Sequence, residues 1–283
     1  MDFKRTQFLL LVFFIIFDIY LGLTLMGKLN VRMIDSSRNN AINIEQQLKN
    51  RNIKFNQVLD TQTTALPLVK VDQNQELESK KDTLQQQTVK FNNEQLIGTF
   101  ETPLDIGLTS LKDKNEITDE DIEALQQNFL SKSELFLHGL EYPIWSYSSE
   151  TRTLTLYMAG YDGRPIVDGS AELRLVLNAD FLLREYTQTY QGERVALDEP
   201  KELMSARDAL KLLEKRVDTY IPDGATIEQV NLAYYRTMNL KDLDIYSPVW
   251  EIVYRQDETT VRTVLVDAID KQIVTRPTTN STN

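Results

Sequence analysis

Residues 8–26 read FLLLVFFIIFDIYLGLTLM, and this apolar run decides the architecture of the chain. Its 19 residues carry a single charge, at Asp18. An α-helix of that length, rising ~1.5 Å per residue, just crosses a hydrocarbon core of ~30 Å. The fourteen Leu, Ile, Phe and Val residues contribute roughly −4 to −8 kcal/mol to insertion, against about +2.5 to +3.5 kcal/mol for a central Asp. The run therefore predicts a transmembrane helix.

A cleaved signal peptide is the alternative for this segment. The basic pair Lys4-Arg5 suits such a peptide, but the apolar run is longer than a typical signal-peptide core. The exit sequence, residues 24–28 (TLMGK), contains no A-x-A-like cleavage site, and the chain has no Cys to accept a lipid. We therefore expect an uncleaved anchor.

The orientation of the anchor follows from the lengths of its two flanks. Basic residues lie on both sides of the run, so the positive-inside count is ambiguous. Long domains, however, are translocated largely regardless of charge. We expect residues 1–7 in the cytoplasm and the bulk of the chain outside the cell membrane. A seven-residue tail cannot form a catalytic or DNA-binding domain, so any message to the cytoplasm is expected to pass through another membrane protein.

One face of the predicted helix is a candidate partner-binding surface. An ionisable residue near the bilayer centre indicates function and usually faces a helix partner. A glycine one turn away allows a second backbone to approach closely. On this chain the face comprises Phe14, Asp18, Gly22 and Leu25. The alternative is a protonated Asp that is simply tolerated in a strongly apolar helix.

Composition excludes several functional classes. The chain has 283 residues, 31 Lys and Arg, 42 Asp and Glu, one His and no Cys, with a net charge of −11. Such an acidic chain is a poor ligand for phosphate backbones, so no nucleic acid partner is expected. Disulfides, thiolate zinc sites and iron–sulfur clusters need cysteine, and a multi-His metal site needs more than one histidine. No cofactor or metal is expected.

Beyond the anchor, helices alternate with groups of strands. Apolar spacing predicts a helix over residues 36–50, and Thr-x-x-Asp or Ser-x-x-Asp boxes predict helix starts at Thr118 and Ser205. The second helix is expected to bury Ile122, Leu125 and Phe129 on one face. Period-two patterns predict strands over residues 153–158, 173–177 and 181–190, and again over 229–236, 248–255, 261–268 and 273–275. Consecutive strands after each helix favour an α+β fold with antiparallel sheets.

These elements predict two extracytoplasmic lobes of helix plus antiparallel sheet. Polar stretches supply the boundaries, with residues 102–115 as the main candidate. A further division near residue 196 stays open. The expected order is a cytoplasmic tail (1–7), a transmembrane anchor (8–28), a membrane-proximal lobe (29–104), a membrane-distal lobe (105–276) and a disordered tail (277–283).

No pattern in the chain indicates catalysis. There is no G-x-S-x-G motif, and the single imidazole, His138, is interpreted as a surface or hydrogen-bonded loop residue. Acidic pairs for glycoside hydrolysis are too numerous to be informative, and Trp145 and Trp250 are more typical of core than of sugar stacking. We assign no catalytic, cofactor-binding or metal-binding residue and expect a non-enzymatic protein.

The two ends of the chain resemble one known family. The start has the form Met-Asp-aromatic-x-basic-Thr, followed by an apolar helix with a central Asp, and the C-terminal part contains residues 248–254 (PVWEIVY) and 264–267 (VLVD). This combination resembles the YycI family across essentially the whole chain. The residues of the N-terminal match are Met1, Asp2, Phe3, Arg5, Thr6 and Asp18.

The resemblance implies a function. YycI-like proteins are membrane-anchored regulators that associate, with the sister protein YycH, with the YycG (WalK) sensor histidine kinase of a cell-wall two-component system. It also implies contacts partly through the membrane helices, which suits Asp18 and Gly22. Residues 205–275 look like a PepSY module, so a tethered binding or protease-inhibitory module is the alternative function. An enzyme acting on wall glycans is a third, weaker hypothesis. The sign of regulation does not follow from the resemblance.

Overall fold

The structure is a computed structural model, and it describes residues 14, 17, 44–55, 57, 59, 63–114, 116–215, 220–257 and 260–274. The chain divides into two compact units, Met1–Asn52 and Ile53–Asn283. In the first unit the structure describes helix α2, Ile44–Asn50, which lies within the predicted helix of residues 36–50. All the sheets belong to the second unit.

A seven-stranded sheet is organised around one long strand, β13 (Leu243–Arg255). One edge of β13 pairs with β12, and the other pairs with β3 near Tyr246 and with β14 near Trp250. The remaining strands lie outside these, β1 parallel to β12, β15 beside β14 and β10 beside β3. The bounds are β1 Lys54–Phe55, β3 Val69–Asp72, β10 Arg194–Ala196, β12 Thr226–Asn239, β14 Val261–Asp267 and β15 Gln272–Val274. A short separate ladder joins β2 (Ala65–Leu66) to β11 (Lys201–Glu202).

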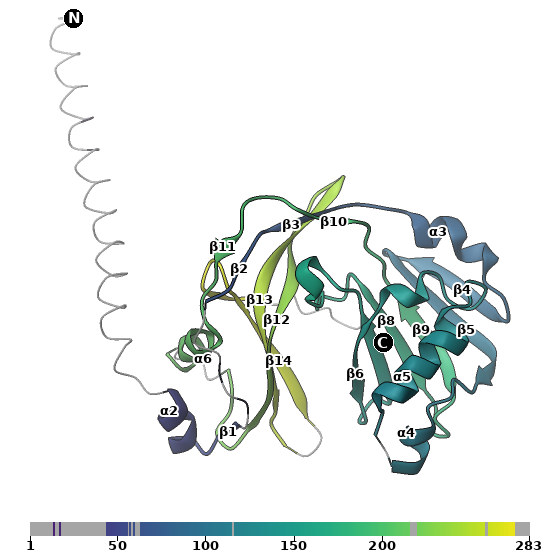
Figure 1. Ribbon diagram of the computed structural model, residues 1–283, viewed down its shortest axis with the longest axis horizontal. Coiled ribbons are helices and arrows are strands. Elements are labelled where there is room, and N and C mark those ends of the chain that lie inside the picture. Colours follow the sequence, from purple (N-terminus) through teal and green to yellow (C-terminus); the bar gives the residue numbers. More distant parts are fainter. Residues whose placement is uncertain are drawn as a thin grey trace, which may run out of the picture. The chain divides into compact units, whose positions relative to one another are not determined.

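A six-stranded antiparallel sheet forms the second layer of strands, in the order β4-β5-β9-β8-β7-β6 (Figure 1). Its inward side chains alternate along β8, where Leu173, Leu175 and Leu177 are buried as the period-two pattern predicted. The strand bounds are β4 Gln87–Asn92, β5 Gln95–Leu104, β6 Ile144–Ser148, β7 Thr153–Tyr157, β8 Glu172–Leu177 and β9 Leu183–Gln188. The mixed α+β fold with antiparallel sheets is therefore confirmed.

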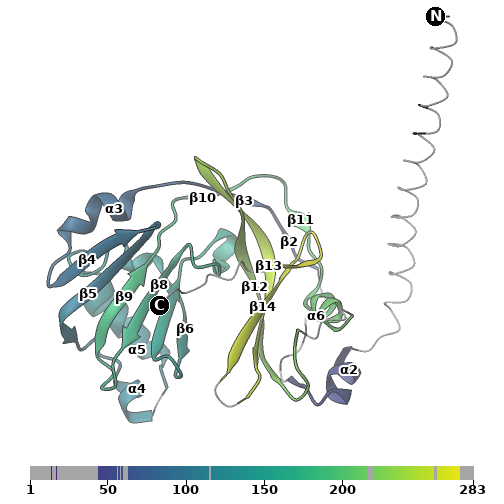
Figure 2. The ribbon, with the colours of Figure 1, turned by 180° about the vertical axis from the view of Figure 1, so that it is seen from behind.

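Short helices accompany these sheets. Helix α5 lies along the six-stranded sheet, α4 lies at the lower end of that sheet, and α6 lies beside the seven-stranded one (Figures 1 and 2). Both predicted start boxes are present, since Thr118 Oγ1 accepts from the Asp121 amide and Ser205 Oγ from the Asp208 amide. The bounds are α3 Glu76–Lys80, α4 Thr109–Lys114, α5 Asp119–Leu125 and α6 Ala206–Glu214, with short turns η1 Lys81–Thr83, η2 Gln126–Leu130, η3 Gly139–Glu141 and η4 Tyr161–Gly163.

The expected apolar face of the second helix needs a correction. Ile122 and Leu125 are buried, but Phe129 is only half-buried, and Leu130 is buried in its place. The reason is that α5 continues into a π-helical turn, η2, in which the Ser131 amide donates to the Gln126 carbonyl. The wider turn shifts the register of side chains by one residue relative to an α-helix.

The connection between β7 and β8 joins the two sheets. The Val167 amide donates to the Tyr234 carbonyl at 3.0 Å, and the Tyr234 amide donates to the Pro165 carbonyl at 2.8 Å. Val167 also enters the core of the seven-stranded sheet with Ala233, Val249 and Leu265. The two sheets are thus held together by backbone pairing and by a shared apolar cluster.

Apart from β2, the strands of residues 53–104 are divided between the two larger sheets. β1 and β3 belong to the seven-stranded sheet, whereas β4 and β5 belong to the six-stranded sheet. Each sheet therefore contains strands from both sides of residue 104, the C-terminal end of β5. Residues 275–283, which include the predicted disordered tail, lie outside the described residues.

Candidate functional site

The predicted partner-binding face lies mostly outside the described part of the chain. Of its four residues only Phe14 is described, and its side chain is 54% exposed. Asp18, Gly22 and Leu25 lie outside the described residues, so their role stays a prediction. Within the described residues, no helix has the length and apolar character needed to cross a bilayer.

A cluster of charges around Arg236 lies where the two sheets meet. Arg236 on β12 points its guanidinium at Asp244 on β13, with Nη1 2.9 Å from Asp244 Oδ2. Its Nε lies 3.5 Å from Oδ2 of Asp168, which belongs to the β7–β8 connection. Glu94, at the β4–β5 turn, lies 3.6 Å from the same Nη1. One guanidinium therefore contacts carboxylates from both sheets.

Burial makes these contacts stronger than surface ion pairs. The side chains of Asp244 and Asp168 are 2% and 6% exposed, and that of Arg236 is 25% exposed. Burial opposes the charge of Arg236, but the hydrogen bond to Asp244 and the neighbouring carboxylates outweigh it, so the pKa of Arg236 is raised above its usual value. In a partly desolvated site, removal of one partner leaves an uncompensated charge.

A hydroxyl pair extends this cluster into the core. Ser170 Oγ donates to Asp168 Oδ1 at 2.6 Å and lies 2.8 Å from the Tyr246 hydroxyl. Tyr246 is fully buried on β13, as the register partner of Arg236. Burial, together with the charge of Asp168, raises the pKa of Tyr246 far above its usual value. The tyrosine is therefore a neutral hydrogen-bonding group that fixes the β7–β8 connection on the seven-stranded sheet.

The Arg236 cluster forms part of the wall of a cavity of about 690 Å³. Its other walls come from the segment before α3, from α3 itself, from the β4–β5 turn and from the chain that follows β9. Its volume falls within the ~300–1,000 Å³ range of small-molecule sites. The residues at which the cavity is charged are Glu78, Glu94, Asp168, Arg236, Lys241, Asp242 and Asp244.

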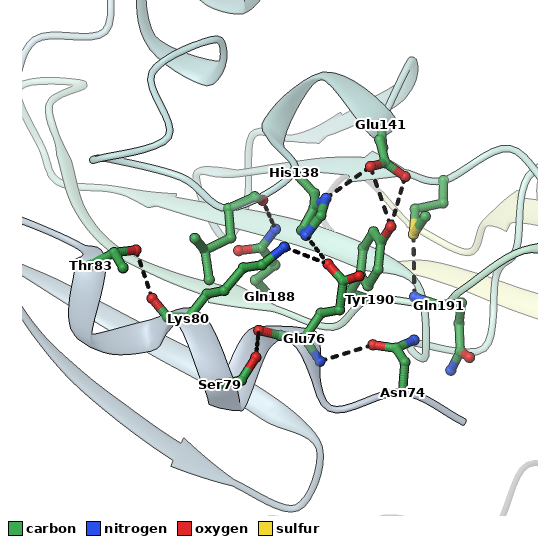
Figure 3. Close-up of polar contacts among 12 residues, drawn as sticks. Asn74, Glu76, Ser79, Lys80, Thr83, His138, Glu141, Gln188, Tyr190 and Gln191 are labelled. Atoms are coloured by element: carbon green, nitrogen blue, oxygen red, sulfur yellow. Dashed lines mark hydrogen bonds and ion pairs between the residues drawn. The ribbon is translucent and has the colours of Figure 1, made fainter. Parts of the chain in front are cut away.

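The only histidine of the chain lies in a second polar cluster (Figure 3). His138 has a left-handed backbone, with φ of 50°, just before the turn η3. Its Nε2 lies 2.6 Å from Glu76 Oε2 on α3, and its Nδ1 lies 2.9 Å from Glu141 Oε1. Both ring nitrogens thus lie within hydrogen-bonding distance of carboxylate oxygens, one on each side of the ring. The interpretation of His138 as a hydrogen-bonded loop residue is confirmed.

Tyr190 connects the His138 cluster to the cavity. Its ring stacks on the imidazole with centroids 4.3 Å apart, and its hydroxyl donates to Glu141 Oε2 at 3.0 Å (Figure 3). Burial and the adjacent Glu141 carboxylate raise the pKa of Tyr190 to about 12. Tyr190 also lines the 690 Å³ cavity, so the two clusters share a wall.

Lys80 completes the His138 cluster from the next turn of α3. Its Nζ lies 2.8 Å from Glu76 Oε2, the oxygen that also receives His138. The hydrogen bond from Lys80 lowers the pKa of Glu76, with His138 adding to the effect and burial opposing it. Every carboxylate oxygen that faces His138 is thus engaged by a cation or a hydroxyl. These contacts hold α3 against η3. Both imidazole nitrogens face carboxylate oxygens, so among the described residues no nucleophilic hydroxyl or amine lies against them for the imidazole to activate.

Neither the Arg236 cluster nor the His138 cluster was predicted from the sequence. Arg236 and Asp244 flank the turn of the β12–β13 hairpin, but the predicted strands covered residues 229–236 and 248–255, so Asp244 fell between them. Asp168 lies in the β7–β8 connection, Glu76 in α3 and Glu141 in η3. These segments are distant in the chain, and no spacing rule marks the three residues. The described residues hold no group of three or more His, Asp or Glu side chains arranged for a metal ion.

Comparison with known proteins places most of the chain in one family. The model of the family described as YycI protein matches residues 31–269. A search of curated proteins found no match. Among solved structures, an uncharacterized protein from Eubacterium rectale ATCC 33656 aligns with a TM-score of 0.45 and 11% identity, covering 80% of this chain and 90% of that one. The Bacillus megaterium YpeB C-terminal domain aligns with a TM-score of 0.36 and 8% identity, covering 75% and 86%.

Proposed function

Because the chain belongs to the YycI family, a family of regulatory proteins, we propose that it is a non-enzymatic, membrane-anchored regulator of a sensor histidine kinase that controls cell-wall metabolism. The single observation that carries the proposal is the match of the family over residues 31–269. The kinase is of the YycG (WalK) type, and a YycH-like protein is the second partner. The apolar run at residues 8–26 supports the membrane anchor.

The proposed location is the cell membrane, with residues 1–7 in the cytoplasm and the sheets outside. From the membrane and from its outer side, the protein acts on the kinase by changing which of its signalling conformations is favoured. A coupling free energy of ~1–3 kcal/mol shifts such an equilibrium about 5–150-fold. The interface therefore need not be large, and one face of a helix together with extracytoplasmic contacts is sufficient.

In this proposal the transmembrane helix has two roles, as anchor and as contact surface. Asp18 makes the polar contact, and Gly22 allows the partner helix to approach, with Phe14 and Leu25 extending the packed face. A polar residue in hydrocarbon is stabilised when a partner helix supplies a hydrogen bond, typically by ~0.6–2 kcal/mol. This gives the regulator specificity for its partners within the bilayer.

The experiment exchanges the helix. Residues 8–26 are replaced by an unrelated transmembrane sequence without Asp or Gly, and the output of the two-component system is measured in cells. Regulation should be lost although the protein remains anchored and folded. A secreted form that lacks residues 1–28 should also fail to regulate. Full regulation by either form would refute the membrane-coupled mechanism.

The same exchange separates this proposal from a tethered PepSY-like binding or protease-inhibitory module. Such a module needs the helix only as an anchor, so it would function with any transmembrane sequence. Retained function after the helix exchange, together with loss after changes on the sheets, would favour the module.

A further inference from the structure

A buried side-chain amide in the wall of the 690 Å³ cavity has no partner among the described residues. Gln191, in the chain that follows β9, lines the cavity and is 7% exposed. Its polar contacts use backbone atoms, the amide with Met158 Sδ and the carbonyl with Arg194 Nη1, both at 3.5 Å. Its side-chain amide is not sealed from solvent, in contrast to Asp244 Oδ1. Because buried amides are nearly always hydrogen-bonded, this open and unused one indicates where a ligand binds.

The Gln191 side chain points away from the His138 cluster. Figure 3 shows its side-chain amide turned away from Glu141, on the side of Asn74, and without contact to any residue drawn. Asn74 also lines the cavity and lies close to the same chain, since a Cβ added to Gly192 would be 3.5 Å from Asn74 Nδ2. The Asn74 side chain uses its Oδ1 to accept from the Glu76 amide, and its Nδ2 donates to no described residue. Two neighbouring side-chain amides thus offer unused groups to one cavity.

These amides match a pair of adjacent hydroxyl groups. A side-chain amide presents a donor and an acceptor side by side, and two vicinal hydroxyls can engage both at once because each hydroxyl donates and accepts. A trans peptide unit points its N–H and its C=O in opposite directions, so it cannot pair with one side-chain amide in this way. Gln95, at the start of β5, adds a third amide in the cavity wall that bonds to no described residue. Vicinal hydroxyls are the common feature of sugars.

The rest of the lining fits a neutral sugar. Phe91 on β4 is half-buried and lines the cavity, and its ring offers an apolar surface on which the C–H face of a sugar ring can pack. Five carboxylates and two cations also line the cavity, a net formal charge of −3. This charge disfavours sugar acids and sugar phosphates. An exposed carboxylate such as Glu78 accepts hydrogen bonds from neutral hydroxyls.

We propose that this cavity binds a neutral disaccharide. Gln191 pairs with two adjacent hydroxyls of one ring, and Phe91 packs against the face of that ring. The volume of about 690 Å³ has room for both sugar rings. Such a site goes beyond the proposed regulatory function, because it gives the sheets a ligand of their own, and it does not depend on how the transmembrane helix acts.

The test uses the full-length protein in a detergent without a sugar headgroup, with ligand-observed NMR as the measurement. The probes are cellobiose, maltose and N,N′-diacetylchitobiose, which differ in linkage and substituents, and at least one of them should bind. The permethylated form of that disaccharide keeps the rings but has no hydroxyl to donate. It should bind at least tenfold more weakly.

Variants of the cavity wall identify the site. Gln191→Leu keeps the size of the side chain but removes both hydrogen bonds, and should weaken binding roughly tenfold. Because no described residue bonds to this amide, the variant should unfold at the wild-type temperature or above it, whereas a purely structural amide would show the opposite pattern. Phe91→Leu should weaken binding roughly three- to tenfold. Gln127→Leu, an exposed change in η2, is the matched control and should leave binding unchanged.

Several results would overturn the proposal. They are absence of binding of all three disaccharides at millimolar concentration, equal affinity for the permethylated form, and wild-type affinity in both Gln191→Leu and Phe91→Leu. Each would leave the cavity as a site for water. Trialanine is the last probe, and its binding in place of the disaccharides would overturn the proposal in favour of a peptide.

Discussion

Arg236 Nη1 lies 2.9 Å from Asp244 Oδ2 across the β12–β13 hairpin, and the carboxylate it contacts is almost completely buried. The same guanidinium reaches Asp168 in the connection that joins the six-stranded sheet to the seven-stranded one. Arg236 therefore connects the β12–β13 hairpin to the β7–β8 connection, and through it one sheet to the other. The three residues Arg236, Asp244 and Asp168 also line the cavity.

Replacement of Arg236 by Met should destabilise the protein strongly. The change leaves Asp168 and Asp244 buried without their cation, which typically costs ~3–5 kcal/mol for a buried pair. Because the Arg236 side chain is 25% exposed, we expect the lower end, about 3 kcal/mol. Urea unfolding of the full-length protein in detergent measures it. Arg174→Met, on an exposed side chain, is the control and should change stability by less than ~0.5 kcal/mol.

Replacement of Gly98 by Ala should also be destabilising. The added Cβ would meet the ring of Tyr186 on the neighbouring strand. That ring cannot retreat, because Phe136 and Phe100 pack around it with centroids 5.0 Å and 6.0 Å away. Overpacking of this kind typically costs ~1–3 kcal/mol. The midpoint of urea unfolding gives the measurement.

Gly192→Ala is the matched control for this change. Its Cβ would have the Asp72 carbonyl oxygen as nearest neighbour, at 3.4 Å, an ordinary contact. We expect a change within ~0.5 kcal/mol. Equal stability of the two alanine variants would show that the packing at Gly98 is not as tight as described.

The capping box of α5 should make stability depend on pH below neutrality. Burial opposes the ionised form of Asp121, but hydrogen bonds from Thr118 and Ser110 outweigh it, so the pKa of Asp121 is lowered from 3.8. When the pKa of a carboxyl group is lower in the folded than in the unfolded state, its ionised form stabilises the protein at any pH above the unfolded-state pKa. This stabilisation is lost as the pH falls through the folded-state pKa. Asp121→Asn should therefore be less stable than wild type at pH 7, by about 1 kcal/mol. The difference should shrink below pH ~4.

Unfolding free energies at several pH values, measured for wild type and Asp121→Asn, check this expectation. Asp119→Asn is the control, because Asp119 is exposed in the same turn. A difference between wild type and Asp121→Asn that is independent of pH would contradict the role of the ionised carboxylate.

Substitutions of His138 should separate the effect of its left-handed backbone on stability from the effect of its contacts with Glu76 and Glu141. Because the residue has φ of 50°, glycine fits the backbone better than alanine, and His138→Gly should be more stable than His138→Ala by about 1 kcal/mol. His138→Asn tolerates this conformation and removes the contacts to two half-exposed carboxylates, a loss of about 0–1 kcal/mol, together with the stacking on Tyr190. Thermal unfolding of the three variants gives the order. If the Ala variant proves the most stable, the left-handed backbone at this turn is not maintained.

The parts of the fold that depend on neighbouring residues were predictable. The Thr118 and Ser205 boxes identified the starts of α5 and α6, because their hydrogen bonds form within one turn. Leu173, Leu175 and Leu177 identified β8 because alternation along a strand is a local property. The π-helical turn after Leu125 could not be foreseen, since residues 126–130 carry no sequence signal for it.

The parts that depend on distant pairing were not predictable. β3 contains only four residues, and nothing in them indicates that they pair with β13 instead of joining β4 and β5. The His138 cluster combines residues from α3 and η3 whose separation in sequence follows no motif. Gly98 did carry a usable signal, because glycine inside a strand often marks the close approach of another group.

The most direct test of the regulatory account is photo-crosslinking in the native membrane. A crosslinking residue replaces Ile15 or Gly22, which the helical period places near Asp18, and the same residue at Ile16, on the opposite face of the predicted helix, serves as control. The account predicts that mass spectrometry identifies a sensor histidine kinase or a YycH-like protein at the first two positions and much less at Ile16. Capture of lipid alone at all three positions would contradict it and reduce the helix to an anchor.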